Sequence, residues 1–350
     1  MKISQRDVFL VSGPCSAESL QQLRKTAEQL QQYCRPDVFR AGAWKARTNI
    51  NTFDGYGEDA LRWMKEVKDE FGFPLATEVL MPNHVDLCLK YGIDYVWLGA
   101  RTVVNPFMVQ EISNALKGTE LKIMIKNPVN PDINLWVGAI ERVKKAGIEH
   151  VIAIHRGFST YYTLPYRNMP LWEIPNELRR VFPEIPVVCD PSHICGKNIC
   201  LKEIMQQALD LEMQGLMVET HYMPDEAMSD KNQQITPLQF SELISSLVIR
   251  CNSEQQQQLM HLRNEIDMID DQLLEILSRR MKVVEQIGEM KKKFNITILQ
   301  AERSRHVFAD RMRKGTQLNM NPEFLKEILK AIHNEAIRIQ FEVFGKVSKG

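Results

Sequence analysis

The sequence predicts an α/β protein: a (β/α)8 TIM barrel followed by a small all-α domain of three helices. Three observations lead to this prediction. Short β-branched or apolar runs alternate with longer amphipathic stretches up to about residue 250. Eight such strand–helix units in roughly 250 residues match the size of this barrel. Beyond Cys251 the strand signal ends, and apolar residues recur at helical spacing.

Eight apolar runs are expected to form the strands of the barrel. They occupy residues 8–13, 37–42, 74–79, 95–100, 122–127, 150–155, 186–191 and 215–220. The stretches between them have helical patterns, and their YG, KG, AG and QG steps suit helix ends. A doubly wound open sheet is the alternative fold, but an open sheet rarely needs eight such units.

The tail is expected to hold three helices after a linker. We expect a barrel domain at 1–250, a linker at 251–257 and a helical domain at 258–350, because NSEQQQQ contains no apolar residue. The first helix runs for about 35 residues without a proline and would be about 50 Å long. A second covers about 299–314, and a third begins near Pro322. So small a domain cannot cover the first helix alone, so that helix either docks on the barrel or pairs with another chain.

Composition argues against several classes of protein. Lys+Arg and Asp+Glu both total 44, so the net charge is zero and nothing indicates a nucleic-acid partner. No apolar run approaches the roughly 18 residues of a membrane span, and the N-terminal apolar stretch is too short for a signal peptide. Seven scattered cysteines favour a reducing compartment. We therefore expect a cytoplasmic protein without nucleic-acid or membrane partners.

Four potential metal ligands follow predicted strands, at the carboxyl ends where this barrel places its chemistry. A thiolate, an imidazole and two carboxylates suit a divalent first-row ion, and Mn²⁺, Fe²⁺, Co²⁺ and Zn²⁺ all remain open. The four residues are Cys15, His193, Glu219 and Asp230. His221 competes for the ligand role and ranks lower, and core packing is the simpler interpretation of the other cysteines.

Six cations also lie at or just after strand ends. They are Arg40, Lys45, Arg47, Arg101, Lys126 and Arg156. Six positive charges in one barrel mouth would repel one another unless anions filled it. Two phosphorylated substrates, one with a carboxylate as well, would bring about five negative charges. Arginine suits bidentate phosphate recognition, and lysine suits a point contact.

The ordered motifs GPCS, RAGAWKART, ATEV, LGARTVVNPF, IMIKNP, HRG, CDPSH and VETH resemble those of 3-deoxy-D-arabino-heptulosonate 7-phosphate (DAHP) synthases, in particular the type I-beta branch. The resemblance implies a shikimate-pathway enzyme that joins phosphoenolpyruvate to erythrose 4-phosphate and releases phosphate. The related 3-deoxy-octulosonate 8-phosphate synthases have Asn-Arg-Ser in place of Arg47-Thr48, which favours the four-carbon sugar here. The family's usual proline is Ala46 in this chain, which leaves the contacting side chains intact.

The same resemblance gives the barrel residues their expected roles. It implies that Cys15, His193, Glu219 and Asp230 bind the metal ion. It implies that phosphoenolpyruvate is held by Arg40, Lys45, Arg101, Lys126 and Arg156. Arg47 and Thr48 would hold the erythrose 4-phosphate end. Glu78 and Asp190 would be polar partners in the same mouth, and Lys45 and Glu78 are the candidates for handling the proton of water.

The first tail helix carries Arg280 and Lys291 eleven residues apart, so they share a face, whereas Arg263 lies roughly 100° away. On spacing alone, a solvated helix with i,i+4 ion pairs is the favoured interpretation. The tail also resembles the all-helical chorismate mutases over about 259–341, through LRNEIDMIDDQ, ILQAERSR and IHNEAIRIQ. That resemblance implies an entwined homodimer that converts chorismate to prephenate.

In such a dimer, Arg280 and the partner's Arg263 would hold the two carboxylates of chorismate. Lys291 and Gln340 would face the ether oxygen, and glutamine donates there without needing protonation. Arg303 lies in the E-R step of the motif.

The tail departs from the family pattern at Ser304 and Ala336, where the family usually has Glu and Ser. Each lost neutral hydrogen bond is worth about 0.5–1.5 kcal/mol, so we expect a live but modest mutase. The alternative is a synthase whose tail only senses chorismate or prephenate and dimerises. Because the family's usual extension before the first strand is absent, we also expect prephenate to inhibit the barrel through the tail.

Overall fold

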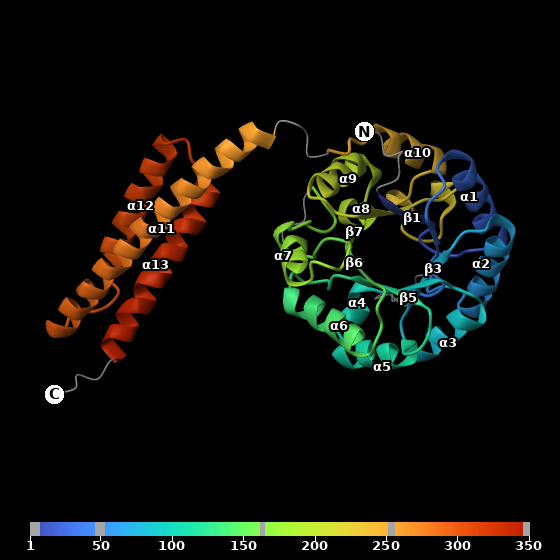
Figure 1. Ribbon diagram of the computed structural model, residues 1–350, viewed down its shortest axis with the longest axis horizontal. Coiled ribbons are helices and arrows are strands. Elements are labelled where there is room, and N and C mark those ends of the chain that lie inside the picture. The colour runs from blue at the N-terminus through green and yellow to red at the C-terminus, as the bar shows by residue number, and fades with distance from the viewer. Residues whose placement is uncertain (1–7, 46–52, 162–164, 251–255, 346–350) are drawn as a thin grey trace. The chain divides into compact units, whose positions relative to one another are not determined.

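The computed structural model describes residues 8–45, 53–161, 165–250 and 256–345. These residues form two compact units that divide at residue 251, and each unit is described by itself (Figure 1). Arg47 and Thr48 lie outside the described residues. No helix in the described part of the chain is long and apolar enough to cross a membrane.

The first unit is a closed barrel of eight parallel strands in sequence order, so the predicted barrel is confirmed and the open sheet is excluded (Figure 1). The register closes where β1 pairs with β8, from Phe9 opposite Gly215 to Gly13 opposite Glu219. All eight predicted strands are present, shorter at their ends than expected. The strands are β1 (Phe9–Gly13), β2 (Val38–Arg40), β3 (Leu75–Val79), β4 (Tyr95–Leu98), β5 (Lys122–Lys126), β6 (Val151–His155), β7 (Val187–Cys189) and β8 (Gly215–Glu219).

Helices ring the outside of the strands (Figure 1). Each has an apolar face buried against the barrel, as the amphipathic pattern between strands requires. Side chains cap several of their N-termini, for example Asp132 and Thr236. The outer helices are α1 (Leu20–Tyr33), α2 (Glu58–Phe71), α3 (Pro82–Lys90), α5 (Pro106–Leu116), α6 (Ile133–Lys145), α7 (Glu173–Val181), α9 (Leu201–Asp210) and α10 (Pro237–Ser246). Two short helices, α4 (Ala100–Val103) and α8 (Pro191–Cys195), follow the carboxyl ends of β4 and β7.

The inside of the barrel is filled by one apolar layer to which every strand contributes one side chain. The layer consists of Val11, Val38, Ala76, Trp97, Met124, Ile154, Val188 and Met217, none of them more than 1% exposed. Because strand side chains alternate with a period of two, the residue two positions later on each strand also faces inward. This second layer lies at the carboxyl end and determines where polar chemistry can occur.

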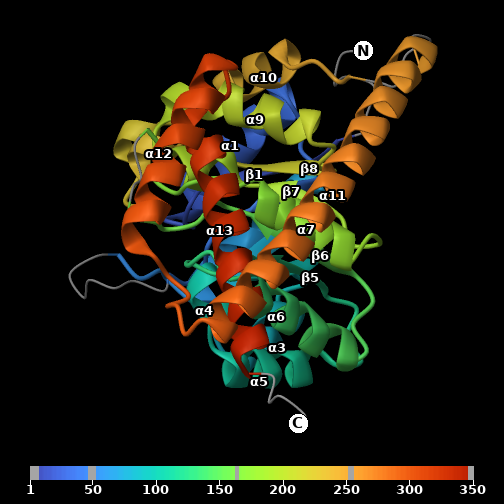
Figure 2. The same cartoon turned by 90° about the vertical axis from the view of Figure 1, so that its left-hand side faces the viewer.

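The second unit contains three helices, as predicted: α11 (Gln256–Lys293), α12 (Ala301–Gln317) and α13 (Pro322–Gly345). Figure 2 shows α13 lying along α11 in the lower half of this unit, with α12 beside α13. Gly288 on α11 allows close packing, since a Cβ there would lie 3.3 Å from side-chain atoms of Gln340 and Val343. The described residues of this unit leave many large apolar side chains of α11 exposed.

Candidate active sites

The layer directly above the apolar layer is almost entirely charged. Its members, two residues beyond each apolar one, are Gly13, Arg40, Glu78, Gly99, Lys126, Arg156, Asp190 and Glu219. The two glycines leave room for their neighbours: a Cβ on Gly99 would lie 2.0 Å from Oε1 of Glu78. Six of the residues proposed from sequence therefore share one level at the carboxyl end of the barrel.

One part of this layer is built around Asp190, which is fully buried after β7. Nζ of Lys126, at the end of β5, lies 2.9 Å from its Oδ2, and Nδ1 of His193 lies 2.8 Å from the same oxygen. Burial would raise the pKa of Asp190, but His193 and Lys126 hold it well below its usual range. Burial lowers the pKa of His193, which favours the neutral imidazole, the form that binds a metal ion.

A second part pairs Arg40 at the end of β2 with Glu219 at the end of β8, the two strands that flank β1. Nη2 of Arg40 lies 3.1 Å from Oε1 of Glu219, and both side chains are 1% exposed or less. The Arg40 guanidinium also lies 4.8 Å above the Trp97 ring. Its Nε and Nη1 are buried without a hydrogen-bond partner among the described residues. A buried guanidinium with unused donors is ready to receive an anion.

Cys15, Lys45 and Asp230 meet above this pair. Nζ of Lys45 lies 3.0 Å from Sγ of Cys15, and Sγ lies 3.4 Å from Oδ2 of Asp230. Burial and the neighbouring Glu219 raise the pKa of the Cys15 thiol to about 12. Burial alone would lower the pKa of Lys45, but Cys15 and Glu219 outweigh it and raise that pKa. Cys15 is therefore a thiol beside an ammonium group, and metal binding would release its proton.

The four proposed ligands form two close pairs. Cys15 contacts Asp230 at 3.4 Å, and Nε2 of His193 lies 4.0 Å from Oε1 of Glu219. Among the described residues, no three His, Cys, Asp or Glu side chains already converge as a cage for an ion. Ligands of one ion at about 2.0–2.3 Å lie roughly 3–4 Å apart, so the separation within each pair and the donor types are compatible with a shared divalent ion. In this structure, Lys45 and Arg40 lie among the donors instead.

Arg156 and Arg101 are the other predicted cations that the structure describes. Nη1 of Arg156 donates to Oδ1 of Asn168 at 3.0 Å, and burial lowers the pKa of Arg156 to about 10. Arg101 is exposed on α4, and its positive charge contributes to the lowered pKa of Arg156. His221 lies apart from the four proposed ligands: its Nδ1 accepts from the backbone of Met223, and its Nε2 is 3.9 Å from Glu18.

The helical unit has its own cavity of about 880 Å³ between its helices. Arg280, Lys291, Arg303 and Gln340 all line it, whereas Arg263 is exposed elsewhere on α11. No carboxylate occurs among the described residues that line it. Its six cationic side chains are Arg280, Lys291, Arg303, Arg305, Arg311 and Lys330. The cavity suits a small polyanion.

Lys291 and Gln340 are in contact within this cavity. Nζ of Lys291 donates to Oε1 of Gln340 at 2.9 Å and to the carbonyl oxygen of Ile298 at 2.6 Å. Burial and Arg303 lower the pKa of Lys291. The two departures from the mutase pattern also lie here: Oγ of Ser304 is 3.3 Å from Nε2 of His333, and Ala336 is buried.

Comparison with known proteins identifies the family of each unit. A family model described as "DAHP synthetase I family" matches residues 3–256. The chain belongs to the DAHP synthetase I family. A second model, "Chorismate mutase type II", matches residues 262–341. The chain is therefore an enzyme in which a DAHP synthase domain precedes a chorismate mutase domain.

The relatives of this DAHP synthetase I family member are named after two different products, a heptonate and an octonate. The phospho-2-dehydro-3-deoxyheptonate aldolase of Thermotoga maritima is 27% identical over 247 residues, covering 71% of each chain. The 2-dehydro-3-deoxyphosphooctonate aldolase of Thioalkalivibrio sulfidiphilus is also 27% identical over 247 residues, covering 65% of this chain and 83% of the relative. The crystal structure of the Thermotoga maritima DAHP synthase superposes with a TM-score of 0.61 at 26% identity, covering 68% of this chain and 67% of that one.

Sequence reasoning missed several polar residues of the synthase site. Arg167, in the loop after β6, donates to Asp230 at 3.0 Å, and Asn127 accepts from the backbone of Arg156 at 2.7 Å. Gln233 and Gln234 contact proposed ligands and are buried. For the two glutamines, the sequence feature that could have indicated a role is the polar run SDKNQQ after the last strand, because it also contains the proposed ligand Asp230.

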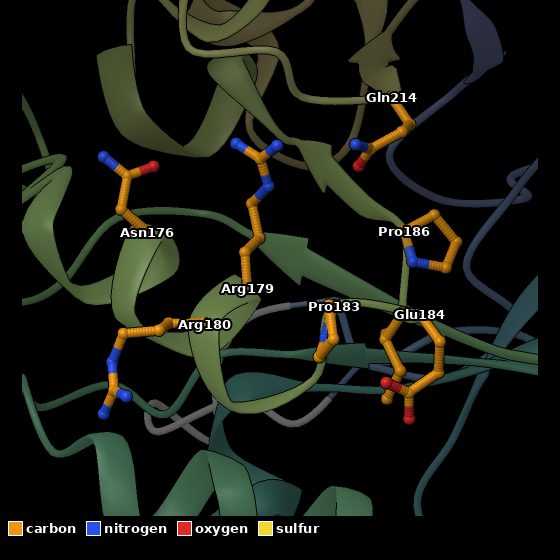
Figure 3. Close-up of a pocket in the computed structure, with 8 residues that line it drawn as sticks. Asn176, Arg179, Arg180, Pro183, Glu184, Pro186 and Gln214 are labelled. Carbon is orange, nitrogen blue, oxygen red and sulfur yellow. The ribbon is translucent and has the colours of Figure 1, made fainter.

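Another hollow, of about 640 Å³, lies at the amino end of the barrel beside the start of β7 (Figure 3). Its cations have partners within the chain. Nη1 of Arg179 donates to the carbonyl of Leu211 at 2.6 Å, and Arg180 pairs with Glu177 at 2.7 Å. Since the chemistry of these barrels lies at the carboxyl ends, we assign no site here.

Proposed function

We propose that the barrel condenses phosphoenolpyruvate with erythrose 4-phosphate to give DAHP and phosphate. The observation that carries the proposal is the charged layer that lies directly on the apolar layer at the carboxyl ends of the strands. Arg40, Lys126 and Arg156 project from it, and Lys45, Arg101 and Arg167 surround it. Four carboxylates offset six cations only partly, so the mouth favours anionic substrates. Those carboxylates are Glu78, Asp190, Glu219 and Asp230.

Each part of the site has a defined task in this proposal. The cations hold two mutually repelling anions in contact, which is mainly a proximity effect. A divalent ion held by Cys15, His193, Glu219 and Asp230 would supply Lewis-acid polarisation of the aldehyde oxygen. The enol carbon of phosphoenolpyruvate then forms the new C–C bond, water adds to the adjacent carbon, and phosphate leaves by C–O cleavage. Lys45 and Glu78 lie near enough to each other to interact and are the candidates for moving the proton of that water.

The relatives leave open whether the aldehyde is a four-carbon or a five-carbon sugar phosphate, because both seven-carbon and eight-carbon products occur among their names. Arg47-Thr48 in the sequence favours the four-carbon sugar. The test is phosphate release from phosphoenolpyruvate with each sugar phosphate, before and after treatment with a chelator. We expect activity with erythrose 4-phosphate that chelation removes and a divalent ion restores. Activity that survives complete chelation would contradict the metal part of the proposal.

For the helical unit we propose the rearrangement of chorismate to prephenate. The supporting observation is a cavity of about 880 Å³ whose described lining residues include six cations and no carboxylate. Within it, Nζ of Lys291 donates to Oε1 of Gln340 at 2.9 Å. The cations would bind the two carboxylates, and Lys291 with Gln340 would stabilise the ether oxygen as the C–O bond breaks. Ser304 and Ala336 offer fewer hydrogen bonds than the usual residues, so a modest rate is expected.

The rival function for the helical unit is sensing without catalysis. Loss of chorismate absorbance by the full-length chain separates the two, with Lys291→Met as the matched variant. We expect turnover in the wild type and a loss of about 100-fold or more in the variant, the usual effect of removing such a donor. Tight chorismate binding without turnover would support the sensor instead.

The proposal includes a homodimer through α11 and inhibition of the barrel by prephenate. A partner would cover the exposed apolar residues of α11 and bring the partner's Arg263 to the cavity. The regulatory part is tested by adding prephenate to the synthase assay of the full-length chain. An unchanged synthase rate at saturating prephenate would contradict inhibition by prephenate, without bearing on either of the two proposed activities.

A further inference from the structure

Two adjacent buried glutamines, Gln233 and Gln234, contact the proposed metal ligands, although neither is a proposed ligand or substrate-binding residue. They are 1% and 2% exposed and come at the end of the short turn η4 (Lys231–Gln233), which follows Asp230. A buried side-chain amide is costly unless its hydrogen bonds are made. Each of these amides is satisfied by a different part of the candidate site.

The amide of Gln234 joins the loop after β1 to the loop after β8. Its Oε1 accepts from the backbone N–H of Cys15 at 3.0 Å, and its Nε2 donates to the carbonyl of Ser229 at 2.9 Å. Ser229 directly precedes Asp230, and its hydroxyl is also hydrogen-bonded to that of Ser16. One side chain therefore fixes the backbone beside the thiol and beside the carboxylate, which lie 3.4 Å apart.

The amide of Gln233 performs the same task for the two carboxylates. Its Nε2 donates to Oε2 of Glu219 at 2.7 Å. Its Oε1 accepts from Nη1 of Arg167 at 2.7 Å, and the same nitrogen donates to Oδ1 of Asp230 at 3.0 Å. The orientation of Glu219 is thus linked to that of Asp230 through one glutamine and one arginine.

We propose that Gln233 and Gln234 are positioning residues that hold Cys15, Glu219 and Asp230 in the arrangement required to bind the divalent ion. Both amides contact the backbone or side chains of the proposed ligands and their neighbours, so the role proposed for them is positioning and not catalysis. The inference rests on the proposed metal site, and it adds that the affinity of that site depends on both amides. Residues that orient metal ligands commonly change affinity by about 10- to 100-fold when they are replaced.

Cobalt titration of the metal-free, full-length chain tests the proposal without any measurement of activity. Co²⁺ bound by a thiolate gives a charge-transfer absorption, and Cys15→Ser should abolish it. We expect Gln233→Ala and Gln234→Ala to weaken Co²⁺ binding about 10- to 100-fold. The control is Gln239→Ala: this exposed glutamine caps α10 and should leave the affinity unchanged.

A further variant separates positioning from folding. Gln234→Glu keeps the acceptor for the Cys15 N–H and removes the donor to Ser229, so its affinity should lie between wild type and Gln234→Ala. Thermal melting of the metal-free proteins, followed by circular dichroism, identifies any variant that has lost its fold. If an alanine variant has lost its fold, the Co²⁺ affinity of Gln234→Glu tests the proposal in its place. Wild-type affinity in the folded Gln233 and Gln234 variants would overturn the proposal. A wild-type chain without the charge-transfer band would overturn the metal site itself, and the positioning role with it.

Discussion

At the scale of single residues, the synthase domain balances buried charges by close pairing. Lys126 and Arg40 each contact a fully buried carboxylate, Asp190 and Glu219, at 2.9 and 3.1 Å. Burial of unpaired ions would cost several kcal/mol each, so these pairs permit charge to exist inside the barrel. Nε and Nη1 of Arg40, which have no hydrogen-bond partner among the described residues, could donate to a bound anion.

A buried histidine outside the site gives a prediction about pH and stability. His155 is fully buried between Phe158 and Trp172, and burial lowers its pKa to about 3. The unfolded chain binds the proton near pH 6.5, so the contribution of His155 is complete above that pH and is lost as the pH falls toward 3. Between pH 7.5 and 5.0 it should cost about 2 kcal/mol of the free energy of unfolding.

Urea unfolding at the two pH values checks this prediction. His155→Phe should lose about 2 kcal/mol less than wild type over the interval, and replacement of the exposed His150 by Gln serves as the control. An equal decline in His155→Phe and wild type would show that the ring is not held neutral by the fold.

The positions of single residues, as distinct from their roles, could be predicted from sequence where the strand period fixed a side chain. Arg40, Lys126 and Glu219 end strands, and so their shared level follows from alternation. Gln233, Gln234 and Arg167 could not be assigned in this way, because they belong to irregular loops whose path depends on tertiary contacts. Their roles come from hydrogen bonds between residues more than 10 positions apart in the chain.

At the scale of elements, the last residue of β1 leads the chain toward the thiol of Cys15. Gly13 has φ +148°, and a Cβ there would lie 2.1 Å from the backbone oxygen of Arg40. Gly13→Ala should therefore cost about 2–5 kcal/mol, from backbone strain and overpacking together. Gly118 has φ +77°, but a Cβ there would meet no atom within 4 Å, so Gly118→Ala should cost only about 1–2 kcal/mol.

Chemical denaturation of the two alanine variants measures this difference. The Gly13 variant should also bind a divalent ion more weakly, because Cys15 lies two residues further along. Equal stability of the two variants would show that the end of β1 can relax around the methyl group.

The long helix α11 carries an apolar stripe that the described residues of its own unit leave exposed. Leu262, Ile266, Ile269, Leu273 and Ile276 are spaced by four, three, four and three residues, and each is more than half exposed. That spacing is typical of a helix that pairs with another helix along one face. The helix itself could be predicted from the sequence, whereas its docking on the barrel or pairing with another chain stays a prediction. The bounds of the tail helices depended on local capping and shifted by a few residues.

We expect Leu273→Asp to dissociate the proposed homodimer, because it buries a charge in an apolar interface. Sedimentation velocity of the full-length chain should show a shift from dimer to monomer, with loss of mutase turnover. Glu275→Ala, on the same helix, should leave the assembly unchanged. A Leu273→Asp chain that stays dimeric would place the interface elsewhere.

At the scale of the whole molecule, one chain carries two unrelated anion sites. The barrel site draws its residues from the ends of many strands, whereas the helical cavity is lined by residues of α11, α12 and α13 and the segment between α11 and α12. The sequence made the two domains predictable, because the change from strand to helix periodicity near residue 251 is abrupt.

The most direct test of the account is to measure both activities in two full-length variants. Lys126→Met removes a cation of the barrel layer, and Arg280→Met removes one of the helical cavity. We predict that Lys126→Met loses synthase activity by about 100-fold or more while its mutase activity stays within about twofold of wild type, and that Arg280→Met shows the reverse. Loss of both activities in either variant, or of neither, would contradict two separate active sites.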